Sequence, residues 1–502
     1  MFKYFPHTEE DLQEMLKATK VESIHNLFDD IPEPARFKRD YELPEALSET
    51  DLRLFFNQLT APHNTRQLVC FAGAGCYDHY APSVVQNIIQ RSEFLTSYTP
   101  YQAEISQGTL HYIFEYQSMI AELTGMDIAN ASMYDGATAT AEAAIMAWNN
   151  AKKATRVLVS ETLDPKIRRV VETYAHFNGF PIKLVPAVNG AIDRNALDQE
   201  LAEGGVAGLI VQQPNYYGIV EDYTGIADKI HEQKGIFIVN ANPSDLAILK
   251  TPAEWGADVA VGEGQSLGIP MTFGGPGVGY MACTEKLMRK IPGRIVGQTI
   301  DNRGQRAFVL TLQAREQHIR RQKATSNICS NQSLMALYVT IYLSLMGKEG
   351  LREVAEMSYA GAHSLRDKLV ATGKFEDTFP GQPFFNEFCV DYEGDLDALL
   401  DECTANGYLA GIKVGEKTLM LAVTEQRSPE EIDELVDIIQ QFKTEEAKVC
   451  TGHYMETSSS SCRRKDARVT LCHKIMTALT LRRNCPRLCA ERKRQGCPSA
   501  MS

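Results

Sequence analysis

The chain has 502 residues, of which 44% are hydrophobic and 23% are charged, the composition of a globular protein large enough for two or more domains. Its formal net charge of -13 argues against nucleic acid or an anionic membrane as a partner, and no apolar stretch approaches the roughly 18 residues of a membrane-spanning helix. The first residues lack both the apolar stretch of a secretory signal and the character of a transit peptide, so we expect a cytoplasmic protein.

Residues 1–60 predict a helical arm. Thr8 and Ser48 each precede acidic residues, as expected of the residue that caps a helix N-terminus. Apolar residues after Ser48 recur at the spacing of one helix face: Leu52, Phe55, Phe56 and Leu59. We expect this arm to pack on something larger.

Residues 61–110 are rich in loops and include a polar, stiff segment around Pro100. This segment, residues 96–108, gathers hydroxyls, two tyrosines, amides and one acid. Such a composition is poor core material, so the segment is either part of a site or an ordinary surface loop. Cys76 and His79 lie upstream without a second ligand pair at zinc spacing, and we predict no metal site.

Residues 110–153 predict two helices, 110–123 and 139–153, joined by a loop of small residues at 134–138. A loop of this kind at a helix N-terminus suits a phosphate, because free N–H groups and the helix dipole point at it. It also suits close packing. No lysine or arginine lies beside it, and we therefore favour packing.

Residues 155–285 alternate between short β-branched runs and amphipathic helices, which predicts a mostly parallel, doubly wound sheet. The predicted strands are 156–160, 181–185, 207–212, 235–241, 257–262 and 277–283, and the predicted helices are 165–178, 197–203 and 223–234. Ligands of such sheets bind at the carboxyl ends of the strands. The ends with polar or glycine-rich character are 213–217, 240–243 and 262–279.

The glycine-rich loop 262–279 carries no nucleotide signature. Gly262 and Gly264 begin a Gly-x-Gly, but Leu267 stands at the third position of the dinucleotide motif and no helix is predicted to open there. The chain also lacks the Gly-Lys-Ser/Thr of a P-loop.

Residues 286–345 are predicted as a basic connection followed by a helix rich in Leu and Met. The cations at Arg315, Arg320, Arg321 and Lys323 either grip an anion or form a solvated helix face. Residues 346–447 predict a smaller α+β unit with helices 351–371, 396–406 and 429–442 and strands 386–391 and 418–423. The expected domains are an arm (1–60), a large α/β domain (61–345) and a small α+β domain (346–448).

Residues 449–502 do not continue this pattern. They contain 11 of the lysine and arginine residues, 3 acidic residues and six of the 12 cysteines, with no CxxC pair and no sustained apolar face. We predict a disordered tail or a non-native reading of the gene end, and free thiols for the six cysteines of the body.

Several segments together resemble a known family. The run Thr96-Ser97-Tyr98-Thr99-Pro100-Tyr101-Gln102-Ala103-Glu104 is long and unusual, and residues 23–32, 262–279 and 315–332 support it. Over about residues 1–447 the chain resembles the first, or alpha, subunit of the glycine-cleavage P-protein in its two-chain form. The resemblance implies an α/β, fold-type-I pyridoxal-phosphate architecture: a large, mostly parallel sheet domain plus a small C-terminal α+β domain.

Two positions depart from the catalytic subunit of that family, which carries its cofactor lysine in the loop corresponding to 262–279. Matching the Gly-Pro-Gly that begins at Gly275 puts the lysine's place on Gln265. An amide nitrogen cannot form a Schiff base, because its lone pair is delocalised. The aspartate that normally pairs with the pyridinium nitrogen falls near Ala241, where no carboxylate is available. We therefore predict no catalytic residue on this chain.

The resemblance implies that the chain is one subunit of a glycine dehydrogenase (decarboxylating). A homologous beta subunit would bind pyridoxal phosphate and glycine, and the aminomethyl group would pass to the lipoylated H-protein. Five residues of this chain would line the partner's site: Tyr98, Thr99, Tyr101, Gln102 and Glu104. The alternatives are a non-catalytic scaffold or regulatory pseudoenzyme, and a self-sufficient pyridoxal enzyme that uses another lysine.

Overall fold

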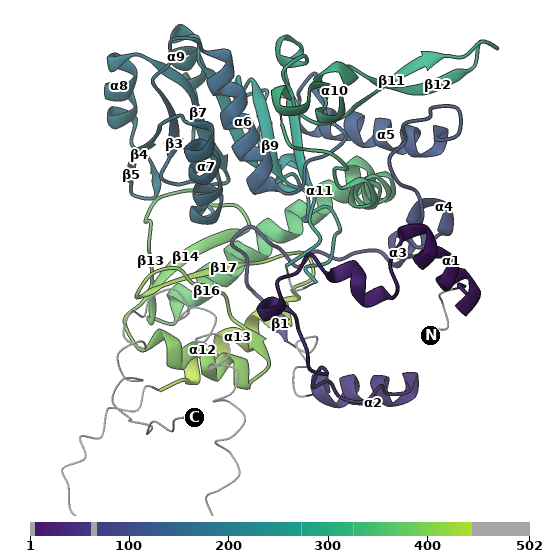
Figure 1. The fold of residues 1–502 in the computed structure, drawn as a ribbon. Coiled ribbons are helices and arrows are strands. Elements are labelled where there is room, and N and C mark those ends of the chain that lie inside the picture. Colours follow the sequence, from purple (N-terminus) through teal and green to yellow (C-terminus); the bar gives the residue numbers. More distant parts are fainter. Residues whose placement is uncertain (1–5, 62–67, 273, 325, 444–502) are drawn as a thin grey trace, which may run out of the picture. The chain divides into compact units, whose positions relative to one another are not determined.

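The computed structural model describes residues 6–61, 68–272, 274–324 and 326–443 (Figure 1). The predicted tail, 449–502, lies outside these residues. In the part of the chain that is described, no helix combines the length and apolar character needed to cross a membrane.

A seven-stranded sheet forms the large domain. Its order is β2-β10-β9-β8-β7-β3-β4, and the strands from β4 through β9 run parallel, whereas β10 is antiparallel to both β9 and β2. All six predicted strands are present, and a short one, β2, was not foreseen. The bounds are β2 Ile128–Ala129, β3 Arg156–Ser160, β4 Ile182–Val185, β7 Val206–Gln213, β8 Ile236–Ala241, β9 Val259–Glu263 and β10 Gly279–Cys283.

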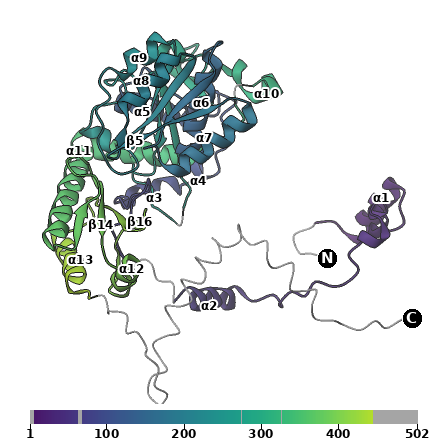
Figure 2. The same cartoon turned by 90° about the vertical axis from the view of Figure 1, so that its left-hand side faces the viewer.

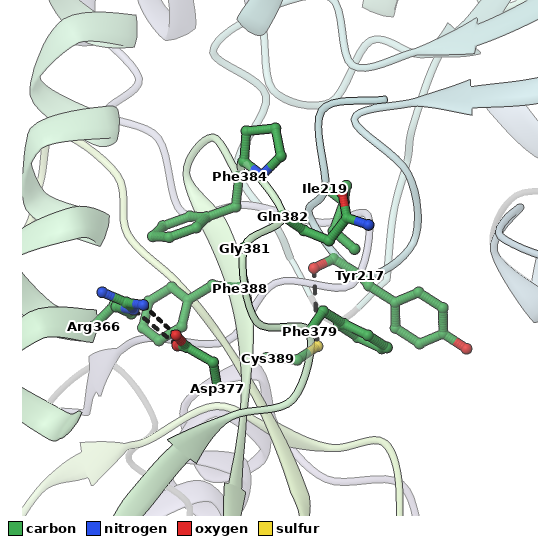
Figure 3. Close-up of a pocket in the computed structure, with 11 residues that line it drawn as sticks. Tyr217, Ile219, Arg366, Asp377, Phe379, Gly381, Gln382, Phe384, Phe388 and Cys389 are labelled. Atoms are coloured by element: carbon green, nitrogen blue, oxygen red, sulfur yellow. Dashed lines mark hydrogen bonds and ion pairs between the residues drawn. The ribbon is translucent and has the colours of Figure 1, made fainter. Parts of the chain in front are cut away.

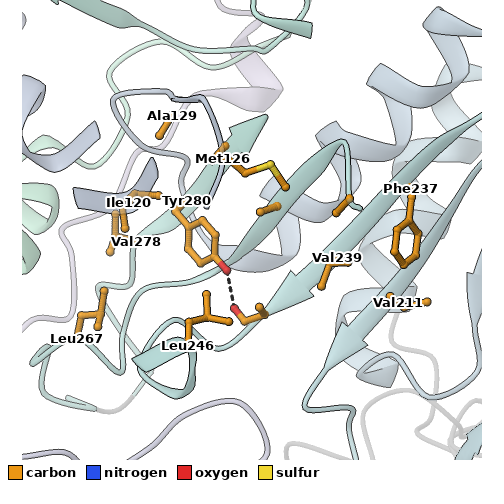
Figure 4. Packing of buried hydrophobic residues seen from close by; sticks show 14 of the residues in the cluster. Ile120, Met126, Ala129, Val211, Phe237, Val239, Leu246, Leu267, Val278 and Tyr280 are labelled. Carbon is orange, nitrogen blue, oxygen red and sulfur yellow. Dashed lines mark hydrogen bonds between the residues drawn. The ribbon is translucent and has the colours of Figure 1, made fainter. Parts of the chain in front are cut away.

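Two apolar layers cover the sheet because successive strand side chains point to opposite faces. On β8, Phe237 and Val239 join the layer beneath α5, and Ile236 and Ile238 join the layer beneath α6 and α7. Figure 4 shows Val239 and Phe237 with other members of the first layer. The helices of this domain are α5 Gln107–Thr124, α6 Gly136–Asn150, α7 Pro165–Asn178, α8 Arg194–Glu203 and α9 Ile226–Glu232.

The small domain is a four-stranded antiparallel sheet with order β13-β14-β17-β16. Its predicted elements are confirmed: β14 Glu387–Tyr392, β17 Thr418–Ala422, α12 Leu396–Ala405 and α13 Pro429–Gln441, beside the short β13 Phe375–Asp377 and β16 Ile412–Lys413. Helix α11, Ser333–Ala371 (Figure 2), contacts both α5 and α13. Its helical geometry breaks at Gly347. Residues of β1, Val69–Cys70, pair with β15, Tyr408–Leu409, so the chain after residue 68 first joins the small domain.

The region predicted as a basic connection contains an antiparallel hairpin instead. Strands β11 Ile295–Ile300 and β12 Arg306–Thr311 pair in continuous register from Ile295 with Thr311 to Ile300 with Arg306. The prediction was wrong here because it followed the basic side chains and overlooked the β-branched residues between them. Five further short elements are α3 Ser83–Ile89, α4 Ser92–Leu95, β5 Ala187–Val188, β6 Ala191–Ile192 and α10 Gln317–Arg320.

The arm contains the two capped helices that its sequence predicts. Thr8 forms a capping box at α1, Glu9–Thr19, and Ser48 accepts from the Asp51 backbone N–H at α2, Glu49–Thr60. The apolar face of α2 is not covered within the described residues: Leu52, Phe55, Phe56 and Leu59 are all exposed. The expected packing partner of α2 is therefore not found in the described part of this chain.

Candidate functional site

Two of the predicted strand ends meet at one edge of the large sheet. Gln265 follows β9, and residues 240–243 form the end of β8, its parallel neighbour, and the start of the loop after it. The Ser266 hydroxyl donates to Asn242 Oδ1 at 2.6 Å, which joins the two segments directly. The structure thus brings together the position expected for a cofactor lysine and the position expected for its aspartate.

Gln265 is buried, with an exposed fraction of 6%, and its amide is fully engaged by backbone. The Tyr77 N–H donates to Gln265 Oε1 at 2.9 Å, and Gln265 Nε2 donates to the Tyr77 carbonyl at 2.9 Å and to the Ile269 carbonyl at 2.7 Å. Because an unmade hydrogen bond in a buried amide is costly, this arrangement holds the side chain in place. The side chain is therefore tied to Tyr77 and Ile269 and does not project toward a ligand.

The end of β8 offers no carboxylate either. Tyr280 donates its hydroxyl to the Ala241 carbonyl at 2.7 Å, as Figure 4 shows, and Asn240 Nδ2 donates to the Thr140 hydroxyl at 2.8 Å. A buried acid that the sequence analysis missed, Asp245, lies four residues further on. It accepts from Asn242 and Ser244, and burial raises its pKa to about 6.

The N-terminus of α6, where a phosphate was one alternative, is closed by the chain's own carboxylates. Asp135 accepts from the Thr138 N–H at 2.7 Å. Glu263 accepts from the Gly136 N–H at 2.9 Å through one oxygen and from the Val278 N–H at 2.8 Å through the other. Burial raises the pKa of Glu263. Packing, the alternative that we favoured, is what the structure shows.

The residues at this edge do not fit pyridoxal phosphate. The cofactor needs an amine for the Schiff base, free N–H groups for its phosphate and a carboxylate for its ring nitrogen. This chain supplies an amide at Gln265, an internal anion at Glu263 and a methyl group at Ala241. Lys250, the lysine nearest in sequence to these positions, places its amine 4.3 Å from the centre of the Trp255 ring.

The predicted partner-facing segment lies largely at the surface of the described chain. Tyr98 is 78% exposed and Tyr101 is 51% exposed; Gln102 and Glu104 are also exposed, and Thr99 is half-buried. Glu104 lines a groove of about 750 Å³ between α5 and the β11–β12 hairpin. The side chains are therefore available to a second molecule, as a partner-lining role requires.

Tyr101 connects this segment with residues 315–332, another of the stretches that carry the resemblance. Its hydroxyl accepts from Arg294 Nη2 at 3.4 Å, and its ring meets the His318 ring edge-on at 5.6 Å. The three side chains border a cavity of about 160 Å³ that Glu316 also lines. Arg294, which the sequence analysis counted only as part of a basic connection, is almost fully buried here.

The four cationic residues that could bind an anion lie in two different environments. Arg315 donates to the Gly293 carbonyl at 3.0 Å and to the Leu312 carbonyl at 3.2 Å, and burial lowers its pKa. Arg320, Arg321 and Lys323 are exposed. Arg315 thus supports the backbone of the loop, whereas the other three form a solvated basic surface.

A separate cavity of about 460 Å³ lies where the loop after β7 meets the small domain (Figure 3). Aromatic residues, among them Tyr217 and Phe379, form much of its lining. Its charged residues, Arg366 and Asp377, are paired with each other through a 2.8 Å hydrogen bond. It contains none of the five residues predicted to line the partner's site, but Tyr217 belongs to the predicted strand end 213–217.

Comparison with known proteins gives a consistent picture. The family model of the glycine cleavage system P-protein matches residues 2–439. A protein of Bacillus cereus (strain B4264) named probable glycine dehydrogenase (decarboxylating) subunit 1 is 49% identical over 444 residues, which are 87% of this chain and 98% of that protein.

Solved structures agree. The crystal structure of a glycine decarboxylase (P-protein) of the glycine cleavage system, in inhibitor-bound form, superposes with a TM-score of 0.79 at 41% identity and covers 88% of this chain and 99% of its own. The sphingosine-1-phosphate lyase of Burkholderia pseudomallei K96243 has a TM-score of 0.61 at 15% identity, over 91% of this chain and 100% of its own. The second likeness concerns the fold alone, which is that of the fold-type-I pyridoxal-phosphate enzymes.

Proposed function

The chain belongs to the family of the glycine cleavage system P-protein, and from this premise we propose that it is the subunit without a cofactor lysine in a two-chain glycine dehydrogenase (decarboxylating). The observation that carries this proposal is Gln265: it is buried at the expected lysine position and bonded to backbone on both sides. A subunit built in this way needs a second subunit that supplies the chemistry.

We propose that a homologous second subunit binds pyridoxal phosphate through its own lysine and binds glycine. The name of the Bacillus relative, subunit 1, supports a second chain. When bound there, pyridoxal phosphate would supply an electron sink for the decarboxylation of glycine. A lipoylated carrier protein, the H-protein, would then receive the aminomethyl group.

The part of this chain in that reaction would be to complete the partner's site. Tyr98, Thr99, Tyr101, Gln102 and Glu104 would line it, with hydroxyl, amide and carboxylate groups that can position glycine or the lipoyl arm. The exposure of this segment in the single chain supports the proposal. The contact of Tyr101 with the buried Arg294 fixes one of these side chains before a partner arrives.

Borohydride trapping with pyridoxal phosphate tests the division of labour. Reduction fixes the cofactor covalently to any lysine that forms a Schiff base with it. The reaction is carried out on this chain alone, on the second subunit alone and on their mixture. We expect label on the second subunit only, and glycine–bicarbonate exchange in the mixture only. Label on this chain would overturn the proposal.

A non-catalytic scaffold is the second candidate, and one observation favours it: the vacated positions at Gln265, Glu263 and Ala241 are all closed by internal hydrogen bonds. The two candidates differ in what the second subunit can do alone. Full exchange activity without this chain would establish a scaffold, whereas activity that requires this chain and falls with changes at Tyr101 would establish a shared site.

A further inference from the structure

We infer that Gln265, together with Tyr77 and Glu387, forms a clamp that joins the large domain to the small domain at the position where a cofactor would otherwise lie. The link between them is residues 73–80, which we call the strap. The strap follows β1 and passes between the loop after β9 and the strand β14. This inference concerns the chain by itself and does not depend on the proposed partner.

The large domain holds the strap through Gln265. Its amide accepts from the N–H of Tyr77 and donates to the carbonyl of the same residue, both at 2.9 Å, so the side chain pairs with the strap backbone as a neighbouring strand would. The third bond, to the Ile269 carbonyl, anchors the amide in its own loop. Gln265 therefore fixes both the position and the rotation of the Tyr77 peptide units.

The small domain holds the same segment through Glu387, the first residue of β14. Its carboxylate accepts from the Ala74 N–H at 2.6 Å and from the Tyr77 hydroxyl at 3.1 Å. All three groups are buried. Tyr77 is thus bonded to the large domain by its backbone and to the small domain by its side chain.

A second set of bonds secures the far end of the strap to the segment after β17. Glu425 meets His79 Nδ1 at 2.6 Å and accepts from the Tyr80 N–H at 2.7 Å. The Asp78 carbonyl accepts from the Thr424 hydroxyl at 2.8 Å and from Gln426 Nε2 at 2.7 Å. The small domain therefore forms hydrogen bonds with the strap at both ends, and the large domain forms hydrogen bonds with its middle.

Packing leaves the clamp little freedom. A Cβ added to Gly73 would lie 2.1 Å from Glu387 Oε1, and one added to Gly218, in the loop after β7, would lie 1.9 Å from the Glu387 carbonyl oxygen. Both distances are far inside van der Waals contact, so only glycine allows the backbone to approach this closely. The relative position of the two domains is in this way set by the protein alone and does not await a ligand.

The chain provides a matched control for this role. Gln117 on α5 is also buried and also brackets one remote residue, because it accepts from the Val296 N–H at 2.9 Å and donates to the Val296 carbonyl at 3.0 Å. It joins α5 to the β11–β12 hairpin and has no partner in the clamp. Gln265→Ala and Gln117→Ala therefore remove comparable bonds at a clamp and a non-clamp position.

Hydrogen–deuterium exchange of the full chain, followed by mass spectrometry, tests the inference. In Gln265→Ala we expect exchange to accelerate by about tenfold or more across the strap and at the start of β14. The reason is that the hydrogen bonds to the large domain and to the small domain both depend on the position of the strap. In Gln117→Ala we expect faster exchange in the hairpin and unchanged exchange in the strap. Acceleration confined to the strap, with β14 unchanged, would overturn the clamp and leave only a local hydrogen bond.

A second variant approaches the clamp from its other side and serves if Gln265→Ala does not fold. Tyr77→Phe removes the hydroxyl that reaches Glu387 but leaves both bonds to Gln265 available. We expect faster exchange in the loop 264–270 of the large domain, because coupling between two sites is reciprocal. Unchanged exchange in that loop would show that the two domains are not coupled through Tyr77.

Discussion

The carboxyl group of Glu387 is buried, and the groups that donate hydrogen bonds to it, the Ala74 N–H and the Tyr77 hydroxyl, are uncharged. Burial raises its pKa from 4.5 to about 7, and the nearby Asp245 adds to that rise. A carboxyl group whose pKa is higher in the folded chain binds a proton more readily there than in the unfolded chain. Its stabilising contribution is present below pH 4.5 and is lost as the pH rises through 7.

We therefore predict that Glu387→Gln changes the pH dependence of stability. Glutamine resembles the protonated acid but does not ionise. The variant should therefore lack the decrease of about 3 kcal/mol in the free energy of unfolding that ionisation of Glu387 causes in the parent chain between pH 4.5 and 7. Urea unfolding at pH 5 and pH 7.5 would measure this. The variant should gain stability relative to the parent chain at the higher pH. A difference between the two proteins that is the same at both pH values would contradict the prediction.

Tyr101 gives a second prediction at this scale, which rests on the proposed function. Tyr101→Phe removes the hydroxyl that accepts from Arg294 and faces the small cavity. We expect glycine–bicarbonate exchange by the two-subunit complex to fall by about tenfold, the effect of one lost polar contact, while the complex stays assembled. Tyr359→Phe, on α11, is the control and should leave the exchange rate unchanged. Glu104→Gln tests the neighbouring position in the same assay.

At the scale of single residues, the sequence predicts what is missing better than what replaces it. That Gln265 stands where the family's lysine is expected is implied by the resemblance, through the match at Gly275. The bonds that Gln265 makes are not implied in this way, because Tyr77 lies 188 positions away in the chain. Glu263 was overlooked for the same reason: its partners at Gly136 and Val278 become visible only when the sheet is assembled.

Among the elements, α6 depends on Glu263 for its N-terminus. A buried carboxylate that accepts from the first N–H groups of a helix satisfies donors and complements the helix dipole. We predict that Glu263→Gln destabilises the chain by about 1–2 kcal/mol, since the amide NH₂ would face one of two N–H donors. Thermal unfolding would measure this, with Glu232→Gln at the exposed end of α9 as the control. Equal midpoints for both variants would show that Glu263 is not needed there.

The elements differ in how far local sequence determines them. The parallel strands and α7 follow their predicted ranges closely, because β-branched runs and a Pro165 N-terminus are local signals. The β11–β12 hairpin was missed because Arg303 and Arg306, in and beside its turn, suggested a basic connection, although the strands themselves are rich in β-branched residues. The pairing of β1 with β15 joins residues about 340 positions apart, which no local pattern reveals.

For the whole molecule, the closed cofactor position implies that stability does not depend on pyridoxal phosphate. A ligand that binds the folded state at 100 times its dissociation constant adds about 2.7 kcal/mol of stability. We predict no shift in the thermal midpoint of this chain at saturating cofactor, because Gln265, Glu263 and Ala241 offer it no anchor. The second subunit that we propose, treated in the same way, should show a higher thermal midpoint. A clear upward shift of the thermal midpoint of this chain would contradict the argument that these three positions cannot hold the cofactor.

The closure at Glu263 and Gln265 also has a consequence for ancestry. A chain that loses its lysine by a single codon change could regain it by another, provided that the space around it stayed open. Here the Gln265 amide is bonded to the Tyr77 backbone, and the Glu263 carboxylate is bonded to the first N–H of α6. A returning lysine would press its amine against the Tyr77 carbonyl with no cofactor to receive it. A single substitution of lysine for Gln265 would therefore not be enough to restore a cofactor site, because several residues would have to change together.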